Sequence, residues 1–179
     1  MGEKWGTVQR RRKFEVTDDS GFLGLVDHHV YQGFVNKDWT YESLFGHFCA
    51  AMEQRSLLLW GTGRENDWTV EVIVGDLVEQ PGFRRAAGPI RVTAGQLHLV
   101  NYESLTMAAQ FDDVRLPEPH RQDLVFEVPT GIYRCEVNQL DDPDVDLEDD
   151  PDRSRPHFLL TLTAGRQAEP WRTPPWHDD

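Results

Sequence analysis

The residues LVFEVPTGIYRCEV at positions 124–137 decide the fold class of this chain. Apolar side chains occupy alternate positions on both sides of a turn: Leu124, Phe126 and Val128 before it, Tyr133, Cys135 and Val137 after it. This period of two is typical of strands with one buried face, and it places Cys135 in the core as a small hydrophobe. Pro129 and Gly131 suit the tight turn between the two halves, so the segment predicts a β-hairpin.

The same reading extends to most of the chain. Strand-like segments are expected at residues 24–35, 57–60, 68–74, 90–93, 97–100, 105–111, 124–128, 132–137 and 158–163. Gly95 supplies the turn of a second expected hairpin, at residues 92–97. Sequential strands with short connections, and no regular alternation of strand and helix, predict a mainly β fold, an antiparallel β-sandwich.

One helix interrupts this pattern, at residues 38–52. Asp38 or Thr40 is a suitable N-cap, and Leu44, Phe48 and Met52 follow at close to helical spacing. Gly46 weakens the segment by about 1 kcal/mol relative to Ala. A short helix ending near Gly46 and a four-turn helix both fit these residues, and the aromatic side chains here are expected in the core.

The chain has 179 residues and 39% of them are hydrophobic, which suits one domain with one core. We place the β-sandwich at residues 21–165, with an N-terminal extension at 1–20 and a C-terminal tail at 166–179. The extension contains the basic run Gln-Arg-Arg-Arg-Lys at residues 9–13, which we interpret as a solvated face before the first strand.

The charge is strongly acidic: 31 Asp and Glu oppose 18 Lys and Arg, for a net charge of -13. Such a charge repels phosphate, so neither nucleic acid nor an anionic membrane surface is expected as a partner. The first residues lack the apolar stretch of a signal peptide, and the two cysteines lack C-x-x-C spacing. We therefore expect a cytoplasmic protein with reduced thiols.

Much of the negative charge lies in residues 141–152, where eight of twelve residues are acidic. These eight are Asp141, Asp142, Asp144, Asp146, Glu148, Asp149, Asp150 and Asp152. We interpret residues 141–155 as an acidic insertion between two strands, which is a solvated loop, a weak divalent-cation trap or a docking element for a basic partner. Trp171 and Trp176 in the tail either lie back on the sandwich or contact a partner. These ten residues are the candidate partner-binding set.

Catalytic motifs are not evident in the sequence: there is no G-x-S-x-G elbow and no phosphate-binding glycine loop. We therefore expect a protein that is not an enzyme and carries no cofactor. Asp27-His28-His29 is the one local cluster of ligand-type residues, and in a strand Asp27 and His29 would share a side. An alternative function is therefore a small-ligand- or metal-binding sandwich, or an enzyme, that uses Asp27, His29 and His98.

Several segments resemble the competence protein J family, the DNA-entry nuclease inhibitors of bacteria and their relatives. The resemblance is carried by LVDHHVY at 25–31, DWTYE at 38–42, the strand beginning at Val70, IRVTAGQLHL at 90–99 and LVFEVPTGIYR at 124–134. It spans roughly residues 22–140. The N-terminal segment, the acidic stretch and the tail depart from the family, and no inhibitory residues are carried over.

The resemblance implies a small β-sandwich that acts by binding another protein, with a nuclease as the expected partner. Clefts that bind nucleic acid are basic, so an acidic protein can occupy one in place of phosphate. An immunity-like inhibitor that blocks a basic protein is therefore the leading functional hypothesis. An interaction domain with no connection to nucleases is the second, and the ligand-binding sandwich is the third.

Overall fold

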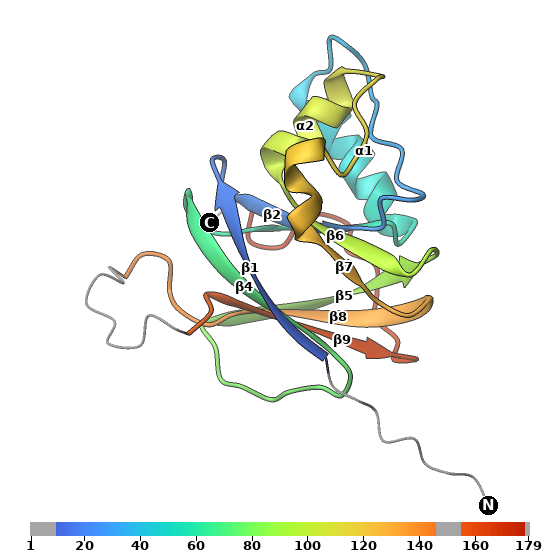
Figure 1. The fold of residues 1–179 in the computed structure, drawn as a ribbon. Coiled ribbons are helices and arrows are strands. Elements are labelled where there is room, and N and C mark those ends of the chain that lie inside the picture. The colour runs from blue at the N-terminus through green and yellow to red at the C-terminus, as the bar shows by residue number, and fades with distance from the viewer. Residues whose placement is uncertain (1–9, 146–154, 178–179) are drawn as a thin grey trace, which may run out of the picture.

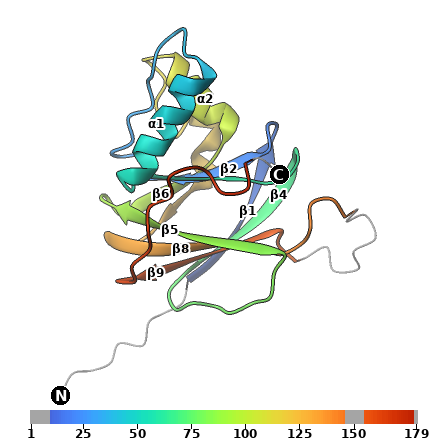
Figure 2. The ribbon, with the colours of Figure 1, turned by 180° about the vertical axis from the view of Figure 1, so that it is seen from behind.

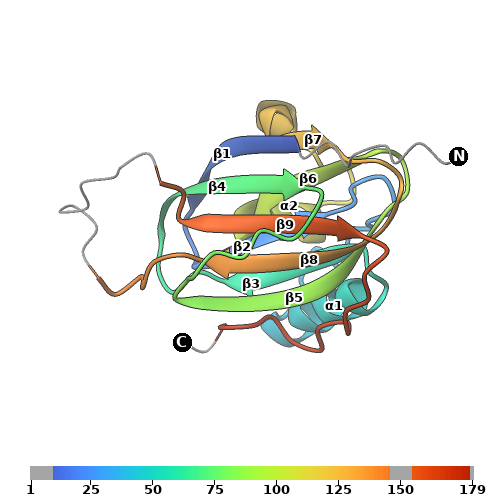
Figure 3. The same cartoon turned by 90° about the horizontal axis from the view of Figure 1, so that it is seen from below.

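The computed structural model describes residues 10–145 and 155–177, which form two stacked β-sheets and a layer of helices (Figure 1). The larger sheet has the order β1-β4-β9-β8-β5, and Figure 3 shows these five strands side by side. Its strands are β1 (Arg10–Asp18), β4 (Asn66–Val74), β9 (Phe158–Ala164), β8 (Gly131–Gln139) and β5 (Arg84–Val92). All its pairings are antiparallel except that of β4 with β9, which is parallel.

The smaller sheet is fully antiparallel and has the order β3-β2-β6-β7. Its strands are β3 (Leu57–Gly61), β2 (Phe22–Val26), β6 (Gln96–Asn101) and β7 (Val125–Glu127). Helices α1 (Tyr41–Glu53) and α2 (Tyr102–Gln110) lie on its outer side, with the short 3-10 helix η1 (Pro119–Leu124) nearby (Figure 1). The mainly β sandwich is therefore confirmed.

The apolar core has two main parts, one on each side of the smaller sheet. Between the sheets lie Trp60, Trp68 and Phe158, with the inward faces of most strands. Between the smaller sheet and the helices lie Phe48 and Met52 among others. Strands β2 and β3 are buried on both faces, which explains why Leu57 to Trp60 form a continuous apolar run.

The two short turns that the sequence predicts as hairpins join different sheets. β5 and β6 flank residues 93–95, and β7 and β8 flank residues 128–130, but neither pair of strands is hydrogen-bonded. The turns themselves lie against each other, because the Val128 N–H donates to the Gly95 carbonyl at 3.0 Å. Turn residues fix where the chain reverses, whereas pairing depends on which sheet each strand joins, so the hairpin predictions are wrong although the strands exist.

Two of the expected strands end or fold differently. The predicted strand at residues 24–35 ends at Val26, because the buried Asp27 carboxylate accepts the His29 N–H at 3.2 Å and starts a turn. Residues 105–111 lie largely in α2, whose N-cap Asn101 accepts the Ser104 N–H at 2.9 Å. Burial of Leu105 and Ala109 on one side shows a helical period, not the period of a strand.

Helix α1 runs for four turns through Gly46. Thr40 caps it in a reciprocal capping box with Ser43, with bonds of 3.1 and 2.9 Å. Gly46 is exposed and has no neighbour within 4 Å of an added Cβ, so it costs helix propensity but no packing. Burial of Leu44 and Phe48 on either side of Gly46 holds the helix together.

The chain joins the sandwich well before residue 21. Strand β1 pairs along its whole length with β4, and Phe14 and Val16 are buried between the sheets. The predicted extension at residues 1–20 therefore needs correction, because residues 10–18 form an edge strand. The run of basic residues masks the alternation of this strand in the sequence, because Arg11 and Lys13 lie on its outer face while Phe14 and Val16 point inward.

The C-terminal residues 165–177 cross the open side between the two sheets (Figure 2). The Trp171 Nε1–H donates to the Ala87 carbonyl on β5 at 2.9 Å, and the Gly61 N–H on β3 donates to the Pro175 carbonyl at 2.9 Å. The tail thus covers one edge of each sheet, which protects both edges from pairing with other chains. None of the helices in the described part of the chain has the length and apolarity to cross a membrane.

Candidate docking face

The acidic stretch that the sequence singles out is described only at its start. Asp141 Oδ1 lies 3.7 Å from Arg155 Nη1, and Asp142 Oδ1 accepts the Asp144 N–H at 2.9 Å, so these two carboxylates have partners within the chain. Asp144 is exposed. The remaining candidates, which lie outside the described residues, are Asp146, Glu148, Asp149, Asp150 and Asp152. Partner binding by this stretch stays a prediction.

The two tail tryptophans are half-buried against the sandwich. Trp171 lies so close to Gly88 that a Cβ there would be 2.9 Å from its ring. The Arg84 guanidinium lies 4.6 Å from the centroid of the Trp176 ring, a cation–π contact. Of the two placements considered for these rings, the structure shows the one that lies back on the sheets, and their part in binding a partner stays a prediction.

The alternative site of Asp27, His29 and His98 does not assemble as expected. Both oxygens of the buried Asp27 are occupied, since Oδ2 also accepts the N–H and hydroxyl of Thr93 at 2.9 and 2.7 Å. The His29 ring contacts Gln96 instead, with 3.3 Å between Nε2 and Oε1. Asp27 therefore stabilises the turn after β2 and is not free to act as a ligand.

His28, which the sequence argument set aside, is the histidine that lies nearest to His98. Their ring centroids are 6.0 Å apart, and the His28 and His29 rings are 4.2 Å apart. Burial lowers the pKa of His98 to about 4 and also lowers the pKa of His28. Within residues 10–145 and 155–177, no three His, Cys, Asp or Glu side chains form a group able to hold a metal ion.

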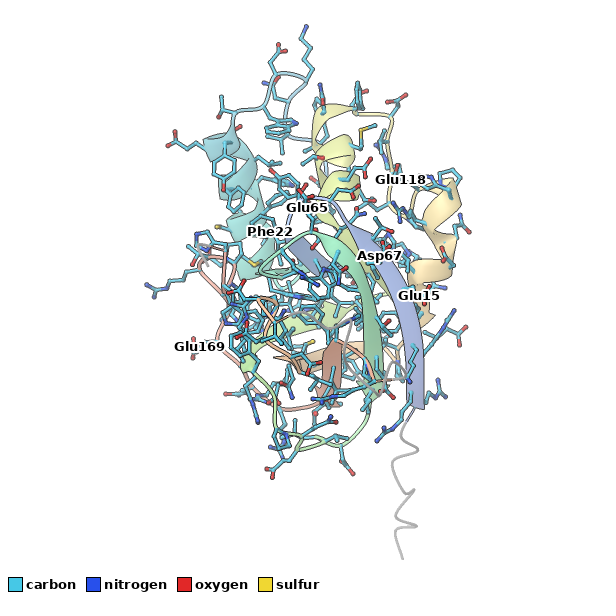
Figure 4. The ribbon with its side chains drawn as sticks, turned by 90° about the vertical axis from the view of Figure 1, so that its left-hand side faces the viewer. Glu15, Phe22, Glu65, Asp67, Glu118 and Glu169 are labelled. Atoms are coloured by element: carbon cyan, nitrogen blue, oxygen red, sulfur yellow. The ribbon has the colours of Figure 1, made fainter. Side chains whose placement is uncertain are left out.

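Four other carboxylates define an acidic face that the sequence argument missed: Glu15, Glu65, Asp67 and Glu118. Figure 4 shows all four on the side of the molecule where β1 and β4 lie near the N-terminal end of α2. The register of β1 and β4 pairs Thr17 with Asp67, and the Thr17 hydroxyl donates to Asp67 Oδ1 at 2.8 Å. Glu15 shares the outer face of the same strand, two residues before Thr17. Glu118 Oε1 accepts the Ser104 hydroxyl at 2.7 Å.

Three of these four carboxylates are exposed, and none belongs to the ion pairs that the described residues form. Glu15, Glu65 and Asp67 are exposed and Glu118 is half-buried. The ion pairs engage Glu71, Glu136 and Asp141 instead. The four carboxylates therefore form no ion pair with another described residue, and their negative charge favours the approach of a cationic partner.

An aromatic cluster lies next to the acidic face, formed by Phe22, Tyr41, Phe45 and Tyr102. The rings of Tyr41 and Phe45 stack at 4.4 Å, and those of Phe22 and Tyr102 at 5.4 Å. Tyr41 is 62% exposed, although it belongs to this packed group. Phe22 and Glu65 face the same side of the molecule in Figure 4. Rigid, partly exposed aromatic side chains beside charges are typical of the energetic centre of protein–protein interfaces.

These features define a class: a two-sheet β-sandwich with a helical layer and an acidic, aromatic-rich side. No protein-family profile matches the chain, and no curated protein matches it in sequence. Among solved structures, the chain is similar to "Crocagin biosynthetic gene J", with a TM-score of 0.62, 14% identity, and coverage of 89% of this chain and 99% of that one.

A second solved structure is ComJ from Bacillus subtilis, described as an inhibitor of the DNA-degrading activity of NucA. Its TM-score is 0.48 and its identity 11%, with coverage of 88% of this chain and 98% of that one. The resemblance of the sequence to the competence protein J family stays a prediction. At 14% identity the first likeness shows a shared fold alone.

Proposed function

We propose that this protein is a non-enzymatic binding protein that docks its acidic face and aromatic cluster on a basic protein. The observation that carries the proposal is the gathering of Glu15, Glu65, Asp67 and Glu118 on one side of the molecule, without ion-pair partners, beside partly exposed aromatic rings. Attraction between an acidic surface and a basic partner raises the association rate, and aromatic side chains supply most of the contact energy.

A nuclease is the partner that we propose to test first. Its cleft must attract phosphate, so it carries the positive charge that an acidic face complements. The net charge of -13 on the whole chain adds long-range attraction to the local contacts. The resemblance to the competence protein J family points to the same class of partner.

The test is an affinity capture from lysate of the source organism, eluted with increasing salt. The variant bait carries Glu15→Gln, Glu65→Gln and Asp67→Asn together. A basic protein that the wild-type bait retains at about 50 mM salt, and that elutes by about 500 mM, is expected to be lost from the variant. The captured protein is then purified and its nuclease activity measured against increasing amounts of the wild-type protein.

A matched control bait carries Glu53→Gln, Glu79→Gln and Asp113→Asn, which remove the same charge from exposed positions elsewhere. It is expected to retain the partner. Equal loss from both baits would show that only the net charge matters and would refute the docking face. If the retained basic protein has no nuclease activity, the docking face is supported and the proposal of a nuclease partner is refuted.

A further inference from the structure

A pocket of about 670 Å³ lies on a different part of the surface, where the end of α1, strands β5 and β8 and the tail meet. Arg55 borders it from the turn after α1, Pro89 and Ile132 from the sheet, and Arg166 and Glu169 from the tail. Ile132 is 44% exposed, a large apolar surface for a residue on a strand. Figure 4 shows Glu169 far from Glu15 and Asp67, so this pocket is separate from the acidic face.

Arg55 has a backbone conformation that glycine normally adopts, with φ of 62°. The N–H groups of Arg55 and Ser56 donate to the carbonyls of Met52 and Ala51, each at 3.0 Å, which is the Schellman pattern that ends a helix. Glycine is the usual residue at this position because a side chain costs about 1 kcal/mol there. An arginine held at this cost at the edge of a pocket points to a use for its guanidinium group.

The arginines of this pocket are unpaired in a strongly acidic protein. Neither Arg55 nor Arg166 forms an ion pair or a side-chain hydrogen bond with another residue in the described part of the chain, although acidic residues outnumber basic ones by 31 to 18. Glu169 lies in the same pocket without forming an ion pair to either. The guanidinium groups therefore keep donors free for another oxyanion.

We propose that this pocket binds a small molecule that combines an oxyanion, carboxylate or phosphate, with an apolar group. Arg55 and Arg166 bind the oxyanion, and Ile132, Pro89 and Pro170 contact the apolar group. Glu169 opposes a purely anionic ligand and so limits its affinity. This ligand site is additional to the proposed docking function, so the protein would bind a small ligand as well as a partner protein.

The test uses three probes that share one ring: benzoate, phenyl phosphate and benzyl alcohol. Binding to the full chain is measured by isothermal titration calorimetry at pH 7. Both anions are expected to bind, the neutral alcohol at least tenfold more weakly, and the tighter anion identifies the preferred oxyanion. Equal binding of benzyl alcohol, or no binding of either anion, would overturn the proposal.

The decisive variant is Arg55→Gly, because glycine favours the observed backbone and the fold is retained. Anion affinity is expected to fall about tenfold or more, the effect of one charge-assisted hydrogen bond, while the unfolding midpoint stays level or rises. Arg166→Gln is expected to weaken binding similarly, and Glu169→Gln to strengthen it. The control Arg64→Gln removes an exposed arginine outside the pocket and is expected to change nothing. Wild-type affinity in Arg55→Gly refutes the site.

Discussion

Replacing Asp18 with asparagine is expected to destabilise the protein strongly, because its carboxylate is buried and fully engaged in hydrogen bonds. The buried Asp18 carboxylate lies at the end of β1 and accepts five hydrogen bonds. Its Oδ1 accepts the N–H groups that lead into β2, from Ser20, Gly21 and Phe22 at 3.0, 2.7 and 3.1 Å. Its Oδ2 accepts the Thr62 hydroxyl at 2.7 Å and the Trp68 Nε1–H at 2.9 Å.

The expected cost follows from the bonds that an amide cannot accept. In Asp18→Asn an amide nitrogen replaces one of the two carboxylate oxygens. Replacing Oδ2 costs less than replacing Oδ1, because the Thr62 hydroxyl can then donate to the Arg64 carbonyl, 2.8 Å away, instead. The Trp68 N–H then faces another donor and stays buried without an acceptor, and the three backbone bonds lose their charge. Together these effects cost about 3 kcal/mol, which lowers the unfolding midpoint by about 6–12 °C for a chain of this length.

The assay is urea unfolding followed by tryptophan fluorescence, with thermal unfolding as a second measure. Asp19→Asn is the matched control, since the neighbouring residue is exposed and undergoes the same chemical change. It is expected to change stability by less than about 0.5 kcal/mol. If Asp18→Asn changes stability no more than Asp19→Asn does, the carboxylate does not hold the junction of the two sheets and the reasoning fails.

Three further predictions concern the histidine, the tail and the thiols. Burial lowers the pKa of His98 to about 4, so the unfolded chain binds a proton more readily than the folded chain. The free energy of unfolding is therefore expected to fall by about 3 kcal/mol as pH drops from 6.5 towards 4. Urea unfolding of His98→Gln should show a flatter dependence of stability on pH. A Cβ in Gly61→Ala would collide with the Trp176 carbonyl, so limited proteolysis should cleave the tail faster, with a loss of about 1–3 kcal/mol. Burial raises the pKa of Cys135 to about 12, so a thiol reagent is expected to modify the half-buried Cys49 slowly and Cys135 only in urea.

The position of most strands follows from the sequence, because a half-buried strand must alternate its side chains. Strands near residues 68–74, 124–128, 132–137 and 158–163 lie where the alternation predicts them, and a strand lies at the continuous apolar run of residues 57–60. Cys135 is in the core as expected. The exceptions have local causes. The Arg and Lys side chains of the edge strand β1 obscure its alternating pattern, and the small residues of α2 leave its helical period weak.

The partnerships between strands did not follow from the sequence. β4 lies between β1 and β9, and the parallel pair of β4 and β9 joins residues almost ninety positions apart in the chain, such as Val70 and Phe158. Turn residues at Gly95 and Gly131 reverse the chain in the same way whether the next strand stays in its sheet or crosses to the other. The acidic face combines Glu15, Glu65, Asp67 and Glu118 for the same reason, since three separate segments supply it.

The sequence by itself determined a mainly β domain with a strongly acidic surface, because alternation and net charge are properties of the chain at any conformation. Tertiary structure decided which charges act together. It paired Asp141 with Arg155, enclosed Asp27 in a turn, and left Arg55 and Arg166 unpaired beside one pocket. Hydrogen bonds require contact distances, and salt screens exposed charges beyond about 10 Å, so the function of a charged residue depends on its neighbours in space and not on its neighbours in sequence.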